Sequence, residues 1–118
     1  MSIKIYTYKK CSTCRNATKW LNKKGLLFEE LPIRQTPPEK KELETMLEAY
    51  DGELRPLFNT SGRDYRALAL KDKIPTMSKQ EAFKLLTENG NLVKRPFLLS
   101  DSFKAVGFKS STWEASLD

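Results

Sequence analysis

The sequence predicts an α/β fold in which a β-α-β unit is followed by a helical insert and then by a β-β-α unit. Two observations support this prediction. Between Ile3 and Pro32 the hydrophobic periodicity changes from two residues to the helical spacing and back. Two short apolar segments within residues 97–106 then flank a turn and precede a last helix. With 118 residues, of which 39% are hydrophobic, we expect one domain spanning residues 1–118.

The spacing of apolar residues defines the first three elements. Residues 3–8 alternate and are rich in β-branched and aromatic side chains, which predicts a strand. From Ser12 onward, apolar residues recur at helical spacing, and Gly25 ends that helix. Residues 26–31 are predicted to form a second strand that ends at Pro32. A strand, helix and strand this close together predict two parallel strands with a right-handed crossover.

The middle of the chain, from about residue 33 to residue 90, is predicted to be a helical insert. Thr36 is expected to cap its first helix, with Glu39 completing a capping box. Residues 64–70 are expected to form a short helix. Residues 78–81 form another capping box and predict a further helix.

The last part of the chain predicts two strands and a helix. Residues 97–99 and 103–106 are short apolar segments joined by a turn at Asp101-Ser102, and Ser111 opens the final helix. A β-α-β half joined to a β-β-α half is the thioredoxin-like arrangement, in which helices flank a central sheet. The predicted fold is therefore a thioredoxin-like sheet with a helical insert in its middle.

The composition excludes several classes of site. The chain contains no histidine, which excludes Ser-His-Asp triads, Cys-His dyads and histidine-held zinc or haem. Two cysteines cannot form a four-sulfur zinc site, so we expect neither a bound metal nor a bound cofactor. The formal net charge of +6 comes from cations interleaved with acidic residues. This pattern is typical of a solvated surface, and we expect no direct contact with nucleic acid.

Localisation is predicted from what the chain lacks. No apolar run approaches the length of about 18 residues that spans a membrane, and the N-terminal segment has no apolar signal-peptide core. We therefore expect a cytoplasmic protein that does not contact a membrane, and we expect it to be a monomer. In the cytoplasm, a close cysteine pair is more often catalytic or redox-sensing than structural.

The segment Cys11-Ser12-Thr13-Cys14 lies where the first strand gives way to the first helix. A helix N-terminus stabilises a thiolate, so Cys11 is the expected nucleophile and Cys14, one turn later on the apolar stripe, the resolving thiol. Ser12 and Thr13 supply hydroxyl and N–H groups that suit an anion beside Cys11. The alternative is two unrelated cysteines that act as small hydrophobic residues.

A second candidate group precedes the third strand. Pro96 follows Arg95, and a proline at such a turn can take the cis form. In a thioredoxin-like fold this turn lies beside the reactive thiol, where Arg95 would offer a guanidinium to an anion or to the Cys11 thiolate. The alternative is that Arg95 is a surface charge and Pro96 an ordinary trans proline that starts a strand.

These motifs resemble the glutaredoxin-linked arsenate reductase and Spx family, in particular its small, uncharacterised Gram-positive arsenate-reductase-like members. The resemblance extends over nearly the whole chain. It rests on Cys11-Ser12-Thr13-Cys14-Arg15-Asn16-Ala17, Thr36-Pro37-Pro38, the segment 58–70 and Lys94-Arg95-Pro96. It implies a thioredoxin-like fold with a helical insert.

The resemblance also shows where this chain departs from the family's arsenate reductases. Those enzymes surround one cysteine with three arginines and a histidine. Cys11 and Arg95 match the pattern, whereas Asn59 and Gly107 occupy the other two arginine positions and Thr7 the histidine position. Each missing charge-assisted hydrogen bond removes about 1.5–3 kcal/mol, so we do not expect efficient arsenate reduction. The second cysteine instead implies an intramolecular disulfide.

The resemblance leaves two functions open. One is a thiol-disulfide oxidoreductase with a Cys11-Cys14 redox pair, acting on a small thiol, a protein disulfide or an oxyanion. Glutathione, glutaredoxin or thioredoxin would be its reductant. The other is an Spx-like redox-sensing regulator that binds the RNA polymerase α subunit, for which the family uses a glycine near the position of Gly52. A fold without redox turnover is a third possibility.

Overall fold

The computed structural model of the protein describes residues 2–117. The elements follow the chain as β1 (Ile3–Thr7), α1 (Ser12–Lys23), β2 (Glu29–Pro32), α2 (Lys40–Ala49), η1 (Arg55–Leu57), α3 (Arg63–Ala67), α4 (Leu70–Lys73), η2 (Ile74–Thr76), α5 (Lys79–Glu88), η3 (Gly90–Leu92), β3 (Phe97–Ser100), β4 (Lys104–Val106) and α6 (Ser110–Leu117). This order confirms the predicted β-α-β unit, helical insert and β-β-α unit.

The strands form one mixed sheet in the order β2-β1-β3-β4. Strands β1 and β2 run parallel, whereas β3 is antiparallel to both β1 and β4. In the register, Thr7 lies opposite Pro32 and Tyr6 opposite Phe97. The C-terminal ends of β1 and β2 and the beginning of β3 therefore meet at the same end of the sheet.

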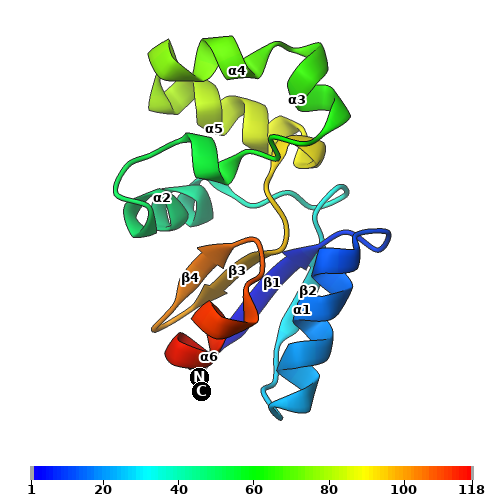
Figure 1. The fold of residues 1–118 in the computed structure, drawn as a ribbon. Coiled ribbons are helices and arrows are strands. Elements are labelled where there is room, and N and C mark those ends of the chain that lie inside the picture. Colours follow the sequence, from blue (N-terminus) through cyan, green and yellow to red (C-terminus); the bar gives the residue numbers. More distant parts are fainter. Residues whose placement is uncertain (1, 118) are drawn as a thin grey trace.

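The two faces of the sheet are covered by different parts of the chain (Figure 1). Because side chains alternate along a strand, Ile3 and Ile5 point to one face and Tyr6 points to the other. The first face packs on α1 and α6, with Trp113 of α6 completely buried. The second face packs on the helical insert, in which Leu43 is also completely buried. The sheet thus separates two apolar clusters.

The structure corrects the predicted start of the helical insert. Thr36 does not cap a helix; α2 begins at Lys40, and Glu39 is the N-cap, in a capping box with Glu42. Pro38 explains the delay, because a proline disfavours helical backbone in the residue before it. Sequence periodicity identified the helix, but the double proline moved its start three residues along the chain, from a cap at Thr36 to a cap at Glu39.

Other boundaries shift by smaller amounts. The second strand is shorter than the predicted 26–31 and covers only Glu29–Pro32. The predicted single helix at 64–70 is two short helices, α3 and α4, separated at Ala69, whose φ of 53° is left-handed. The Ser78 capping box and the stop at Gly25 are both confirmed, and Gly25 has a φ of 72°.

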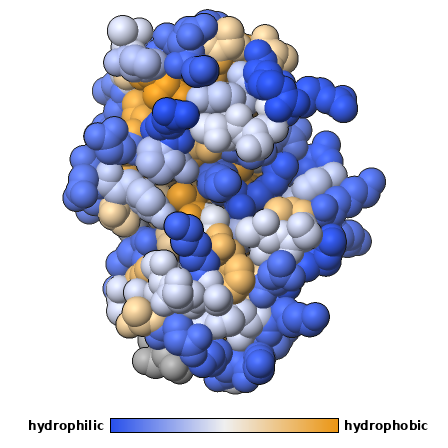
Figure 2. Space-filling view, in the orientation of Figure 1, coloured by the Kyte–Doolittle hydropathy of each residue, from blue (hydrophilic) through white to orange (hydrophobic). Residues whose placement is uncertain are grey.

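The surface is predominantly polar. Figure 2 shows hydrophilic residues over most of one face, with apolar residues confined to small separate areas. Leu27 and Leu68 are the two large apolar side chains that the described residues expose. Within residues 2–117, no helix combines the length and hydropathy needed to cross a membrane.

Candidate functional site

Three segments meet at the end of the sheet where β1 finishes. They are the loop of residues 8–11, the turn that begins at Ile33 after β2, and the approach to β3 at residues 94–96. The backbone N–H of Ile33 donates to the Thr7 carbonyl across 2.9 Å, which holds the second segment against the first. This end of the sheet brings together the cysteine pair and Arg95, as the sequence predicted.

Cys11 is the N-cap of α1. Its backbone is extended, and its Sγ accepts a hydrogen bond of 3.3 Å from the N–H of Cys14. The N–H of Cys11 donates to the carbonyl of Tyr8 across 3.0 Å, which closes the loop after β1. A sulfur in this position faces the unpaired N–H groups and the positive end of the helix dipole, both of which favour its thiolate.

Cys14 lies one turn further and is only 1% exposed, whereas Cys11 is partly exposed. Burial raises the pKa of the Cys14 thiol to about 12, and the nearby Cys11 adds to the rise. A hydrogen bond from the Tyr8 backbone and the charge of Arg95 act in the opposite direction. At neutral pH Cys14 therefore keeps its proton. The structure agrees with the predicted difference in exposure between the two thiols, both of which are reduced here.

Arg95 lies before β3, and its peptide bond to Pro96 is cis. The guanidinium carbon of Arg95 is 5.0 Å from the ring centre of Tyr8, and its charge acts on Cys14. Its Nη1 atom is buried and has no hydrogen-bond partner among the described residues. A buried guanidinium nitrogen without an acceptor is costly, so this donor is suited to an anionic group that arrives at the thiols.

Tyr8 and Arg34 are site residues that sequence reasoning missed. The Tyr8 hydroxyl accepts a hydrogen bond of 2.8 Å from Arg34 Nη1, and the guanidinium carbon of Arg34 is 4.9 Å from the Tyr8 ring centre. Tyr8 thus contacts both Arg34 and Arg95. A signal was available: residues that follow two parallel strands meet at one edge of a sheet, and Tyr8 follows β1 as Arg34 follows β2.

The remaining predicted residues surround the thiols. Ser12 and Thr13 are exposed in the first turn of α1, and Pro96 is buried. Arg15, which the sequence placed near the thiols, donates from Nη1 to the carbonyl of Lys9 across 3.0 Å and so ties the helix to the loop.

The three positions at which this chain departs from the arsenate reductases are occupied by other contacts. Thr7 is buried and donates to Glu30 across 2.6 Å. Asn59 donates to the carbonyl of Asn91 across 3.4 Å. Gly107 donates its N–H to the carbonyl of Pro96 across 2.8 Å, so it lies beside the Arg95 segment without a side chain. None of these three positions offers a cation to the thiol site.

Arg63 and Arg66 also lie away from the thiols. Arg66 donates to the carbonyl of Ser61 across 2.9 Å, and Arg63 acts on Asp64. Both arginines are exposed. Among residues 2–117, no group of three histidine, cysteine, aspartate or glutamate side chains is placed to hold a metal ion.

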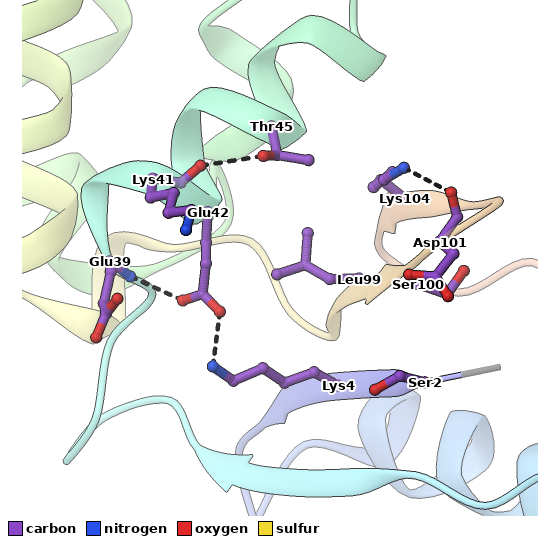
Figure 3. A pocket seen from close by; sticks show the side chains of 10 residues that line it. All are labelled: Ser2, Lys4, Glu39, Lys41, Glu42, Thr45, Leu99, Ser100, Asp101 and Lys104. Atoms are coloured by element: carbon purple, nitrogen blue, oxygen red, sulfur yellow. Dashed lines mark hydrogen bonds and ion pairs between the residues drawn. The ribbon is translucent and has the colours of Figure 1, made fainter.

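The largest pocket is at the opposite end of β1 (Figure 3). It has a volume of 530 Å³ and lies between Lys4 of β1, α2 and the β3–β4 turn. Lys4 forms an ion pair of 2.7 Å with Glu42, and Lys104 donates to the carbonyl of Asp101 across 3.0 Å. Lys4 and Lys104 thus already have partners, and no thiol lines this pocket, whereas the thiols and Arg95 lie at the other end of the sheet.

Comparisons with known proteins agree with the fold. A sequence model of the ArsC family matches residues 6–116. The uncharacterized protein YusI of Bacillus subtilis is 43% identical over 114 residues, which cover 97% of each chain. The global transcriptional regulator Spx of Streptococcus agalactiae is 30% identical over 98% of this chain and 82% of the regulator. The crystal structure of a putative ArsC family related protein from Bacteroides fragilis aligns with a TM-score of 0.88 at 37% identity, covering 98% of both chains.

Proposed function

Because this chain belongs to the ArsC family, we propose that it is a thiol-disulfide oxidoreductase whose redox centre is the Cys11-Cys14 pair. One observation carries the proposal: Cys11 Sγ caps α1 within 3.3 Å of the Cys14 N–H, while the Cys14 thiol is buried directly behind it. One partly exposed thiol at a helix N-terminus and one protected thiol a turn later are the two parts of a dithiol centre.

The two thiols carry out different steps of the reaction. The Cys11 thiolate attacks a substrate disulfide, forms a mixed disulfide and releases one substrate thiolate. That thiolate takes the Cys14 proton, and the Cys14 sulfur then attacks Cys11 Sγ and releases the second substrate thiolate. The protein ends with a Cys11-Cys14 disulfide, and the substrate disulfide has gained two electrons. Glutathione, glutaredoxin or thioredoxin restores the dithiol by the reverse exchange, in a reducing cytoplasmic compartment.

The high pKa of Cys14, about 12, determines which thiol attacks first. A protonated Cys14 does not compete with Cys11 for the incoming disulfide, so the first attack falls on Cys11. Arg95 is proposed to stabilise the Cys11 thiolate or an anionic substrate group through its unpartnered Nη1. The exposed Ser12 and Thr13 line the approach to Cys11.

A titration of the protein against dithiothreitol or glutathione redox buffers tests the proposal. We expect a two-electron transition between the dithiol and an intramolecular disulfide, measured by alkylation and mass spectrometry. Cys14→Ser is expected to stop at the mixed disulfide on Cys11, and Cys11→Ser to show no transition. If both thiols stay free in the folded protein under mild oxidant, the proposal is wrong.

A second function, an Spx-like regulator that binds the RNA polymerase α subunit, is favoured by the similarity to Spx of Streptococcus agalactiae. Gly52, at the expected position after α2, is exposed, has a φ of 81° and lines a pocket of 350 Å³ with Arg55 and Tyr65. Mixed disulfides trapped on Cys14→Ser in cells separate the two functions. Small-thiol adducts support the oxidoreductase, whereas binding of the α subunit, controlled by the redox state and lost on Gly52→Arg, supports the regulator.

A further inference from the structure

A pocket of 430 Å³ lies next to the thiol site, between the first turn of α1 and the connection from β4 to α6. Thr13 lines it on the α1 side, two residues after Cys11. Gly107 lines it on the other side, and its N–H is bonded to the carbonyl of Pro96. The pocket therefore adjoins both segments that frame the thiols, yet the redox mechanism above does not use it.

The lining of this pocket has one sign of charge. Its two charged residues are Lys94 and Lys109, and none of its ten lining residues is an aspartate or glutamate. Neither lysine forms an ion pair with a carboxylate of residues 2–117. The side chain of Lys94 passes over Gly107, where its Cε lies 3.5 Å from the site that a Cβ would occupy. The side chain of Lys94 therefore lies in van der Waals range of Gly107 at the pocket.

The rest of the lining offers hydroxyl groups and an apolar floor. Thr13 and Thr112 are exposed at the rim, and Phe108 packs edge-on against the buried Trp113, with ring centres 4.6 Å apart. Tyr50 of α2 closes one side, because its hydroxyl accepts a hydrogen bond of 3.0 Å from the N–H of Val106. An apolar floor with a few polar groups at the rim is the usual construction of a small-molecule site, and the volume lies in the range of about 300–1,000 Å³ for such sites.

We propose that this pocket binds the carboxylate-bearing part of a small-molecule thiol or disulfide whose sulfur reacts with Cys11. This inference rests on the proposed oxidoreductase function and names its substrate class. Two ammonium groups without a carboxylate partner, in a pocket that Thr13 of the Cys11 turn also lines, select a compound that carries both sulfur and negative charge. The larger pocket near Lys4 does not compete, because no cysteine lines it and Glu39, Glu42 and Asp101 add negative charge to its lining.

The bond changes take place at Cys11, while the pocket holds the carboxylated part of the substrate. The Cys11 thiolate attacks one sulfur of the anionic disulfide, so that a Cys11–sulfur bond forms and one carboxylated thiolate leaves. The bound half stays held by Lys94 and Lys109 until the Cys14 sulfur attacks Cys11. The second thiolate then leaves, Cys14 has lost its proton to the first, and the dithiol has given two electrons to the disulfide. A dithiol reductant regenerates the protein.

The test compares an anionic and a neutral disulfide. The rate of Cys11-Cys14 disulfide formation is measured with oxidised glutathione and with bis(2-hydroxyethyl) disulfide, for the protein and for the double variant Lys94→Gln/Lys109→Gln. We expect the ratio of the two rates to fall about fivefold to tenfold in the double variant. The double variant Lys73→Gln/Lys84→Gln, which removes the same charge from exposed positions of the helical insert, is expected to leave the ratio unchanged.

The outcomes separate this inference from the function on which it rests. If both disulfides oxidise the pair but the ratio is the same in the protein and in Lys94→Gln/Lys109→Gln, the pocket is not an anion site and the inference is wrong. If neither disulfide oxidises the pair, the oxidoreductase proposal is wrong. A titration with S-methylglutathione, which has carboxylates but no free thiol, reads binding without redox chemistry. Shifts of the Thr13, Gly107 and Thr112 amide signals that disappear in the double variant support the pocket, and their absence overturns it.

Discussion

The two ends of β1 differ in whether their charged groups have bonding partners. At its beginning, the Glu42 carboxylate accepts bonds from Lys4 at 2.7 Å, from the Tyr6 hydroxyl at 2.6 Å and from the Glu39 N–H at 3.0 Å. Beyond its end, Arg95 acts electrostatically on Cys14, and its buried Nη1 has no acceptor among the described residues. The polar groups at the beginning of β1 bond to one another and form a closed network. The region beyond the end of β1 keeps a buried donor that has no acceptor.

This difference shows how to distinguish a structural polar cluster from a reactive one. A network whose members satisfy each other contributes to stability and has nothing left to offer a ligand. Unpaired donors cost stability, so their retention beside a thiol points to chemistry. Pocket size alone would have selected the other end, because the pocket at Lys4 is larger than the one near the thiols.

The strongest test of the reactive end is Cys11→Ser. We expect reaction with disulfides to fall by more than about a thousandfold, because a serine hydroxyl does not replace a thiolate. Serine still accepts the helix N–H groups, so the free energy of unfolding should change by less than about 0.5 kcal/mol, whereas Cys11→Ala should lose about 1 kcal/mol with the cap. Disulfide-exchange kinetics and urea denaturation measure the two effects; equal loss of stability in both variants would refute the capping role.

Arsenate reduction is the next test, because its rate depends on how many cations at the thiol end of β1 are available to bind the oxyanion. Only Arg95 occupies a family arginine position, with Asn59 and Gly107 at the other two. Two missing guanidinium contacts, each about 1.5–3 kcal/mol, weaken oxyanion binding about a hundredfold or more. We expect arsenate-dependent oxidation of NADPH, coupled through glutaredoxin or thioredoxin, to stay far below about 1 turnover per second. Turnover of about 1–1,000 per second at submillimolar arsenate would show that other cations replace the missing ones.

The polar network around Glu42, at the beginning of β1, is tested with Glu42→Gln. Burial alone would raise the pKa of Glu42, but the bonds from Lys4 and Tyr6 outweigh burial and hold the pKa below its usual range. Because the folded pKa is lowered, this stabilisation is present above the unfolded value of about 4.3 and is lost as the pH falls through the folded pKa.

We therefore expect Glu42→Gln to lose about 1–2 kcal/mol of unfolding free energy at pH 7 and almost none at pH 3. Urea denaturation at both pH values measures the difference. The rate at which iodoacetamide alkylates Cys11 serves as the control, and we expect it to remain unchanged. A change in that rate would mean that the two ends of β1 are not independent.

The sequence predicted most of the fold because periodicity and turn residues are local signals. It failed at the start of α2, where the choice between Thr36 and Glu39 as the cap depended on the effect of Pro38 on the preceding residue. It also overextended the second strand, because Leu26 and Phe28 pack against the apolar cluster under α1 and α6 without pairing with β1.

The site was predicted in part for a similar reason. The positions of Cys11, Cys14 and Arg95 follow from their motifs and from the order of the strands. Arg34 and Tyr8 carry no motif, and their contact depends on the parallel pairing of β1 with β2. The positive charge of the pocket around Lys94 could not be predicted from the sequence either, because it depends on the absence of aspartate and glutamate from the pocket lining in the folded chain.

The smallest expected effect concerns Tyr8, which links the reactive end to the sheet. Its ring lies 5.0 Å from the Arg95 guanidinium, a cation–π contact of about 0.5–1 kcal/mol, so Tyr8→Leu should slow the reaction of Cys11 with oxidised glutathione about twofold to fivefold. Tyr8→Phe keeps the ring and loses only the bond from Arg34, so its rate should stay within about twofold of the parent. The ratio of the rates with oxidised glutathione and with bis(2-hydroxyethyl) disulfide distinguishes positioning from packing: Tyr8→Leu should lower this ratio, because a displaced Arg95 offers less positive charge to the anionic disulfide. An unchanged ratio in Tyr8→Leu would assign Tyr8 to packing alone.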